Sequence, residues 1–226
     1  MDGLAIYVHQ GCSNWKPAVN QGKCLGGTMT RLRPTLICLA LSAAALSGCS
    51  SAGLPLIFNG KTELAVLDGR DTVHAPDGYC VAPRASRPAD GFVVIAPCNV
   101  LARTGLTPTI PGLITVQVGP DGSAAVTGNE DALAELLAQD EGRALLAVDG
   151  NPATIVVTVS EAYEGHVEVF FSDGTPSFIL GLQPDEWRAF LDRGGRMVTI
   201  AVRGYQYRPI TPSEGLALLR LALSAL

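Results

Sequence analysis

Short apolar or β-branched runs recur along the chain from residue 64 onward, and each run is bounded by Gly, Pro, Asp or Asn. Runs of this length and composition are typical of β-strands. They predict six strands, at residues 64–68, 92–96, 113–118, 154–159, 167–171 and 197–202.

Two internal segments have helical periodicity instead. Residues 130–139 place leucines on one stripe and acidic residues in the first turn, where the helix dipole favours them. Residues 184–193 begin with a proline, place Trp187, Phe190 and Leu191 on one stripe, and stop at a pair of glycines. Both segments are predicted to be helices.

The last segment predicts a third helix. Thr211 and Glu214 have the spacing of a capping box, and six leucines follow before the chain ends at Leu226. A helix that is apolar on nearly every side is buried in its own domain, buried against a partner, or inserted shallowly into a membrane surface. Burial in its own domain is the interpretation we favour.

These elements predict the α+β class: a single domain with an antiparallel or mixed sheet covered by about three helices. Two stretches, 113–148 and 167–202, also resemble each other. Each reads as strand, Asp-Gly turn, second strand (near 123–127 or 177–182), helix and final strand (143–148 or 196–202). The comparison suggests two ββαβ repeats, although hydrophobic patterning alone can produce such a similarity.

A basic and apolar segment precedes this domain. From Met29 the chain has two arginines, an apolar run from Leu36 to Leu46, and small residues that end at Cys49. This order is typical of a secretory signal, and the run is too short to span a bilayer. The sequence Leu-Ser-Gly-Cys that ends at Cys49 resembles the lipobox of bacterial lipoproteins.

The resemblance implies that a lipid is attached to Cys49 through a thioether and that the chain is cleaved just before this residue. Ser50, where some lipoproteins have Asp, implies the periplasmic face of the outer membrane rather than the inner membrane. The alternative is a buried helix end with a free cysteine. The resemblance covers only this segment, so it implies nothing about the rest of the chain.

The domain organisation follows from these assignments. We expect residues 1–28 to be an upstream extension from a misplaced start codon, 29–48 the signal peptide, 49–62 an anchor and linker, and 63–226 the α+β domain. In a different interpretation of the first segment, Cys12 and Cys24 close a small disulfide loop.

The charge of the chain argues against nucleic acid as a partner. The 16 basic residues are outnumbered by 21 acidic ones, and removal of the first 48 residues takes away four of the former and one of the latter. No basic cluster remains that could follow a phosphate backbone. Membrane attachment is therefore expected through the lipid on Cys49.

Two further cysteines, Cys80 and Cys98, follow Cys49 in the mature chain. Both border predicted strands joined by the polar loop 83–90, and an exported protein lies in an oxidising compartment. We expect them to form a structural disulfide with Cα atoms within about 7 Å. The alternatives are a redox pair or a metal site, but CxxC spacing is absent and histidines are few.

Few residues of the sequence indicate catalysis or metal binding. The common nucleophile, zinc and phosphate-binding motifs are missing, and the best remaining constellation is His166 near Glu164, Glu168 and Asp173, where a histidine base could be oriented by a carboxylate. No cofactor or metal is expected.

Tyr205, Tyr207 and Arg208 lie just beyond the last predicted strand and are the candidates for an exposed binding patch. We therefore predict a lipid-anchored, non-catalytic domain that binds a protein or another cell-envelope component. The alternatives are a hydrolase with its site around His166 and a structural envelope scaffold.

Overall fold

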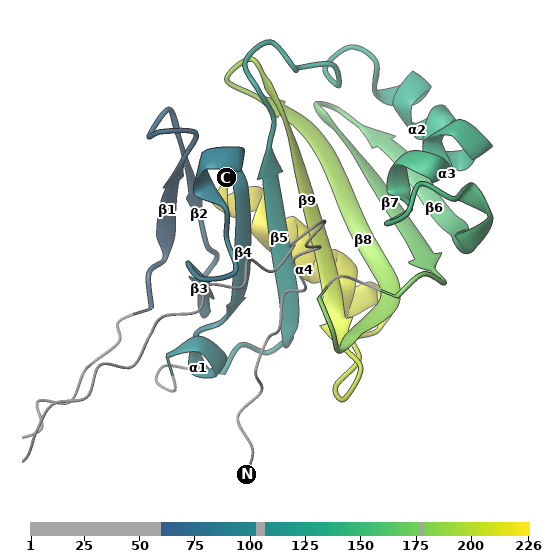
Figure 1. Ribbon diagram of the computed structural model, residues 1–226. Helices are drawn as coiled ribbons and strands as arrows, with labels where there is room; N and C mark the ends of the chain where they lie inside the picture. Colours follow the sequence, from purple (N-terminus) through teal and green to yellow (C-terminus); the bar gives the residue numbers. More distant parts are fainter. Residues whose placement is uncertain (1–59, 103–106, 177–178) are drawn as a thin grey trace, which may run out of the picture. The chain divides into compact units, whose positions relative to one another are not determined.

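A seven-stranded antiparallel sheet forms the centre of the structure (Figure 1). The computed structural model describes residues 60–102, 107–176 and 179–226. The strands, in chain order, are β3 (Tyr79–Val81), β4 (Phe92–Pro97), β5 (Gly112–Val118), β6 (Ile155–Tyr163), β7 (His166–Asp173), β8 (Leu182–Arg193) and β9 (Arg196–Tyr205). Across the sheet they follow the order β3-β4-β5-β9-β8-β7-β6. The predicted α+β class is confirmed.

A separate two-stranded hairpin precedes this sheet. It consists of β1 (Glu63–Val66) and β2 (Asp71–His74), which pair antiparallel. All six of these predicted strands overlap observed strands, whereas β2, β3 and β8 are not among the six.

The C-terminal helix α4 (Pro212–Ala225) packs on one face of the sheet, against β5, β8 and β9 (Figure 1). The predicted capping box is present: the Thr211 hydroxyl accepts from the Glu214 N–H, and the Glu214 carboxylate accepts from the Thr211 N–H. Leu218 and Leu219 are fully buried in the main core. The helix is therefore buried in its own domain, as the sequence favours.

Trp187 of β8 joins the start of α4 to the sheet. Its indole Nε1 donates a 2.8 Å hydrogen bond to the Pro212 carbonyl, and its ring packs on Gly215. A Cβ atom at Gly215 would lie 2.8 Å from Trp187 Cδ1, so the close approach of helix and sheet requires glycine here.

Two helices, α2 (Glu130–Ala138) and α3 (Asp140–Leu146), cover the opposite face only over β6 and β7 (Figure 1). A second core lies between them and the sheet, built around Leu137, Leu146 and Phe171. A carboxylate holds the segment that leads into α2: Asp192 accepts hydrogen bonds from the N–H groups of residues 125–127 at 2.8 to 3.0 Å.

This arrangement predicts a pH-dependent contribution to stability. Burial on its own would raise the pKa of Asp192, but the three backbone donors outweigh it and lower the pKa. A lowered pKa stabilises the fold above the unfolded value of about 3.9, and the contribution is lost as the pH falls through the folded value. We expect Asp192→Asn to lower the free energy of unfolding by roughly 1–2 kcal/mol at pH 7.

Denaturant unfolding of both proteins at pH 7 and pH 3 measures this effect. The difference between them should be smaller at pH 3, because the stability that the lowered pKa supplies is lost progressively once the pH falls below the unfolded value of about 3.9. An equal difference in the free energy of unfolding at both pH values would show that the charge of Asp192 does not contribute to stability.

The prediction of a helix at 184–193 is wrong, because these residues belong to β8. Along β8, Trp187 and Ala189 face the core under α4, while Glu186 and Arg188 alternate with them on the other face. The glycine pair that suggested a helix stop is a hairpin turn: Gly194 and Gly195 have φ of +56° and +77°. Two consecutive positive φ values are what a tight hairpin with right-handed strand twist requires.

The ββαβ repeat is also wrong. Residues 140–146 form helix α3 rather than the beginning of the predicted strand 143–148, and 123–127 form no strand. Of the predicted strand 177–182, residues 177 and 178 lie outside the described part, and β8 begins only at Leu182. The resemblance between the two stretches thus reflects apolar patterning, not a shared unit.

The predicted extension, signal peptide and Cys49 lie outside the described residues. Among the helices that the structure describes, none has both the length and the apolar character needed to span a bilayer.

Candidate functional site

His166 lies at the start of β7, where the structure brings it beside only one of its predicted carboxylate partners. His166 Nε2 is 3.4 Å from Glu168 Oε1, because residues two apart on a strand share a face. Asp173 is at the other end of β7, where it accepts from the N–H groups of Val148 and Thr175. Glu164 is in the turn between β6 and β7.

Glu168 also forms an ion pair with Arg220. The Arg220 guanidinium, from α4, donates to both of its carboxylate oxygens, at 3.2 and 3.0 Å. Glu168 is almost completely buried, and a bidentate arginine is the partner that a buried carboxylate needs. The pair therefore connects α4 to β7, the strand next to the edge strand β6.

Tyr163 completes this cluster. Its ring stacks on His166 with centroids 5.1 Å apart, and its hydroxyl donates a 2.5 Å hydrogen bond to Glu161. This hydrogen bond raises the pKa of Tyr163. The His166 cluster, defined as Glu161, Tyr163, His166, Glu168 and Arg220, thus consists of groups that satisfy one another, and we interpret it as a structural clasp.

The predicted binding residues separate into one buried and one exposed tyrosine. Tyr205 ends β9 and is 7% exposed, whereas Tyr207 is 66% exposed. Their rings stack, with centroids 5.3 Å apart. Burial raises the pKa of the Tyr205 hydroxyl, so it stays protonated. Tyr205 is thus a rigid support beneath Tyr207.

Leu180 extends the exposed surface beside Tyr207, and it was not foreseen from the sequence. Leu182 pairs with Tyr205, and the Gln206 N–H donates to the Gly181 carbonyl at 2.8 Å. Leu180 and Tyr207 lie in the turns directly beyond this pairing, one before β8 and one after β9, at the same end of the sheet. Leu180 is 73% exposed, and Arg208 is also exposed. We call Leu180, Tyr207 and Arg208 the hairpin-end patch.

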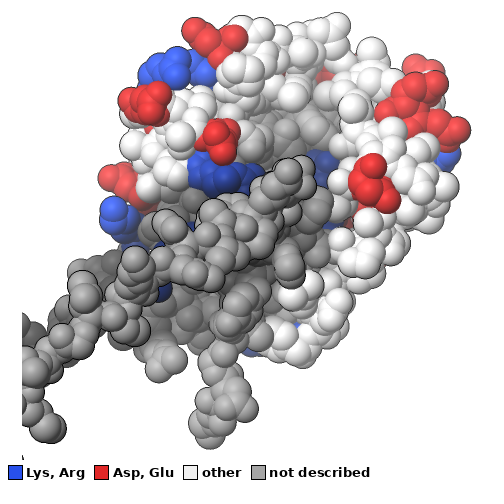
Figure 2. All heavy atoms as spheres, viewed as in Figure 1, with Lys and Arg blue, Asp and Glu red and all other residues white. Residues whose placement is uncertain are grey.

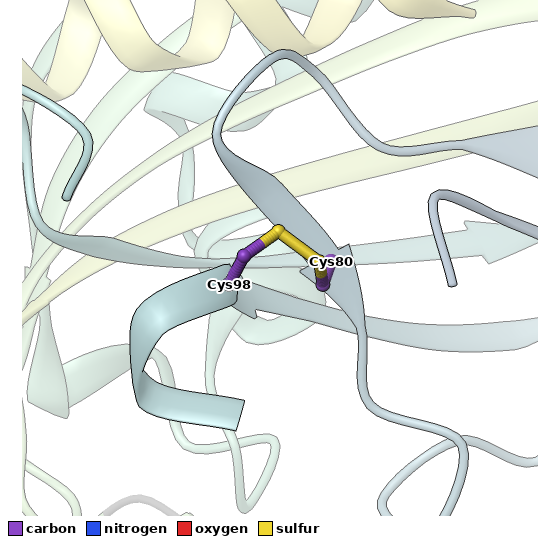
Figure 3. The surroundings of a disulfide bond; sticks show 2 residues. All are labelled: Cys80 and Cys98. Atoms are coloured by element: carbon purple, nitrogen blue, oxygen red, sulfur yellow. A yellow bond between two sulfur atoms is a disulfide. The ribbon is translucent and has the colours of Figure 1, made fainter. Parts of the chain in front are cut away.

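Cys80 and Cys98 form a disulfide, with Cα atoms 4.8 Å apart, as predicted (Figure 3). Cys80 lies on β3, and Cys98 is the first residue of the short helix α1 (Cys98–Leu101), which directly follows β4. Gly60 lies against this bond: a Cβ atom there would be 2.1 Å from Cys80 Sγ. The disulfide therefore lies where the chain from Cys49 joins the domain.

Figure 2 shows acidic side chains gathered over α2 and α3. Within residues 60–102, 107–176 and 179–226, no three His, Cys, Asp or Glu side chains are grouped so that they could hold a metal ion.

Comparison with known families and proteins adds little to this description. No family model matches the chain, and no curated protein matches its sequence. The Saccharomyces cerevisiae Ran-binding protein Mog1p is a similar solved structure, with a TM-score of 0.40 and 13% identity over 72% of this chain and 92% of that one. An E65A mutant of protein Mog1 has a TM-score of 0.38 and 11% identity over 72% and 90% of the two chains.

Proposed function

We propose that the chain is a lipoprotein of the bacterial cell envelope, held at the membrane by a lipid on Cys49, and that its domain binds an envelope protein without catalysing a reaction. The observation that carries the binding role is the hairpin-end patch, in which Tyr207 and Leu180 expose most of their surface in two turns at one end of the sheet.

The disulfide supports export. A bond between Cys80 and Cys98 persists in an oxidising compartment such as the periplasm, and reducing conditions in the cytosol work against it. This agrees with the signal and lipobox resemblance before the domain. The periplasmic face of the outer membrane remains the proposed location.

The composition of the patch supports protein binding. Tyrosine and arginine are enriched at the centres of protein interfaces, and large aromatic anchors contribute most of the affinity. Tyr207 is held by its stack on buried Tyr205, so little side-chain freedom is lost on binding. Arg208 favours a partner segment that presents an apolar side chain next to a carboxylate.

The His166 cluster gives less support to a hydrolase. A general base needs a substrate within hydrogen-bond reach, but Glu168 is buried and held by Arg220. His166 itself stacks on Tyr163.

Photo-crosslinking tests the proposal in intact cells. A photoreactive residue at position 180 should give one discrete crosslinked product, and Tyr207→Ala should lower its yield by about tenfold or more, since loss of an anchor residue costs at least 1.4 kcal/mol of binding free energy. The same residue at position 145, an exposed leucine on α3, should give no such product.

His166→Ala is the matched control, and it should leave the crosslink and the cellular phenotype unchanged. Loss of the phenotype in His166→Ala without a loss of stability would favour the hydrolase instead. An undiminished crosslink in Tyr207→Ala would show that the hairpin-end patch does not bind the partner.

A further inference from the structure

Two arginines share one carboxylate on the face of the sheet opposite α4. Glu186 and Arg188 lie on β8, and Arg203 lies on β9 directly across from Glu186. Glu186 Oε1 accepts from Arg188 Nε and Nη2, at 2.6 and 2.5 Å, and its Oε2 accepts from Arg203 Nε. We call Glu186, Arg188 and Arg203 the Glu186 cluster.

The sheet around this cluster is not covered by the described helices. On this face α2 and α3 pack on β6 and β7, and α1 packs on β3 and β4. In the same row across the sheet, Arg188 lies between Val169 of β7 and the small Ala201 of β9, and Thr115 follows Ala201. Guanidinium and hydroxyl donors thus share this face of the sheet.

The cluster has an uncompensated positive charge in a poorly solvated place. The Glu186 side chain is 3% exposed and that of Arg188 is 17% exposed, so water screens these charges weakly. One carboxylate neutralises one of the two guanidinium groups, and a second anion would neutralise the other.

The guanidinium groups also keep donors for such an anion. The bonds to Glu186 use the Nε atoms and one Nη2 atom, which leaves Nη1 of Arg188 and both Nη atoms of Arg203 without a partner among the described residues. The buried side-chain atoms that lack a hydrogen bond within the described part are Asn99 Oδ1, Arg143 Nε and Thr175 Oγ1, so these guanidinium nitrogens do not belong to that group. Phe171 lies under Arg188, 5.0 Å from its guanidinium carbon, and fixes the plane of the group.

Other arginines of the domain serve a different purpose. Arg193 donates to Asp71, to the Thr72 carbonyl and to the Leu226 carbonyl, and so joins β8, β2 and the end of α4. Among the described residues, Arg188 and Arg203 by contrast bond to Glu186, within two strands that the sheet already pairs.

We propose that Arg188 and Arg203, oriented by Glu186, form a binding site for an oxyanion, the carboxylate or phosphate group of a ligand. Glu186 acts as a positioning residue, since its two carboxylate oxygens hold both guanidinium groups next to each other. Planar forks of this kind suit the oxygens of carboxylate and phosphate. The proposal does not depend on lipid attachment or on the hairpin-end patch.

Thermal unfolding of the full chain in a nonionic detergent tests the site. Acetate and inorganic phosphate should each raise the Tm saturably above that in sodium chloride of equal ionic strength, by about 2–4 °C near tenfold excess over the dissociation constant. A response to acetate alone assigns a carboxylate ligand, and a response to phosphate alone assigns a phosphate.

The variants separate binding from general salt effects. Arg188→Gln should abolish the difference between the oxyanions and chloride, and Arg188→Lys, which keeps the charge but loses the fork, should remove most of it. Arg84→Gln, at an exposed arginine on another loop, should respond like the wild type. The proposal is overturned if Arg188→Gln and Arg188→Lys respond as the wild type does, or if no oxyanion exceeds chloride.

Discussion

We expect Cys49→Ala to move the protein almost completely from the membrane fraction to the soluble fraction or to leave it as an uncleaved precursor. The thiol of Cys49 is the only group in the lipobox-like sequence that can take a thioether-linked lipid. The sequence after Cys49 has no basic cluster that could hold the protein at anionic lipids. Fractionation of host cells with an antibody to the domain, and mass spectrometry of the N-terminal peptide, measure the effect.

Cys38→Ala is the matched control, because Cys38 lies within the same apolar segment but not in the lipobox-like sequence. It should leave fractionation unchanged. An unmodified Cys49 in wild-type protein that still begins at Met1 would contradict the proposed anchor.

The proposed lipid on Cys49 would keep the domain near the membrane. Ten residues separate Cys49 from Gly60, where the described domain begins. Fully extended, the 11 steps reach at most about 36–40 Å. Under this proposal, we expect a partner of the hairpin-end patch close to the membrane surface, which favours another envelope protein over a distant soluble one.

The strands of the sheet were predictable where an apolar run has no alternative interpretation. β4, β5 and β9 are flanked by turn residues and are too short or too β-branched for helices. The same reasoning fails for β8, because the spacing of Trp187, Phe190 and Leu191 fits one face of a helix as well as it fits a strand. Its pairing with both β7 and β9, partners that only the tertiary fold brings together, decides in favour of the strand.

The error over β8 also concealed the charged cluster. On a helix, Glu186 and Arg188 would point in different directions, whereas on a strand they share a face. Arg203 joins them only because β9 lies beside β8. A sequence pattern that places these residues on a helix cannot bring the three charges together.

The exposure of Tyr207 was predicted, but the burial of Tyr205 was not. Tyr205 and Tyr207 are equivalent in the sequence, as aromatic residues two positions apart. Leu182 and Ile179 pack in the same core cluster as Tyr205 and leave Tyr207 exposed. That cover comes from a segment more than 20 residues away, so local periodicity does not reveal it.

The disulfide was predictable because its two cysteines border strands that a short loop joins, so antiparallel pairing brings them together. The bond should also contribute strongly to stability. We expect the double replacement Cys80→Ser and Cys98→Ser to lower the free energy of unfolding by about 3 kcal/mol, the chain-entropy estimate for a loop whose ends are 18 residues apart. Denaturant unfolding at pH 7 measures it.

Reduction of the wild-type protein supplies the control for that experiment. With a thiol reductant present, the wild type should become about as unstable as the double variant, and the double variant should not respond. Because Gly60 packs against Cys80 Sγ, protease cleavage between residues 60 and 80 should also become faster when the bond is lost, before the rest of the sheet unfolds. Equal stability of the wild type with and without reductant, or two free thiols in protein taken from the envelope, would show that the bond does not stabilise the native domain.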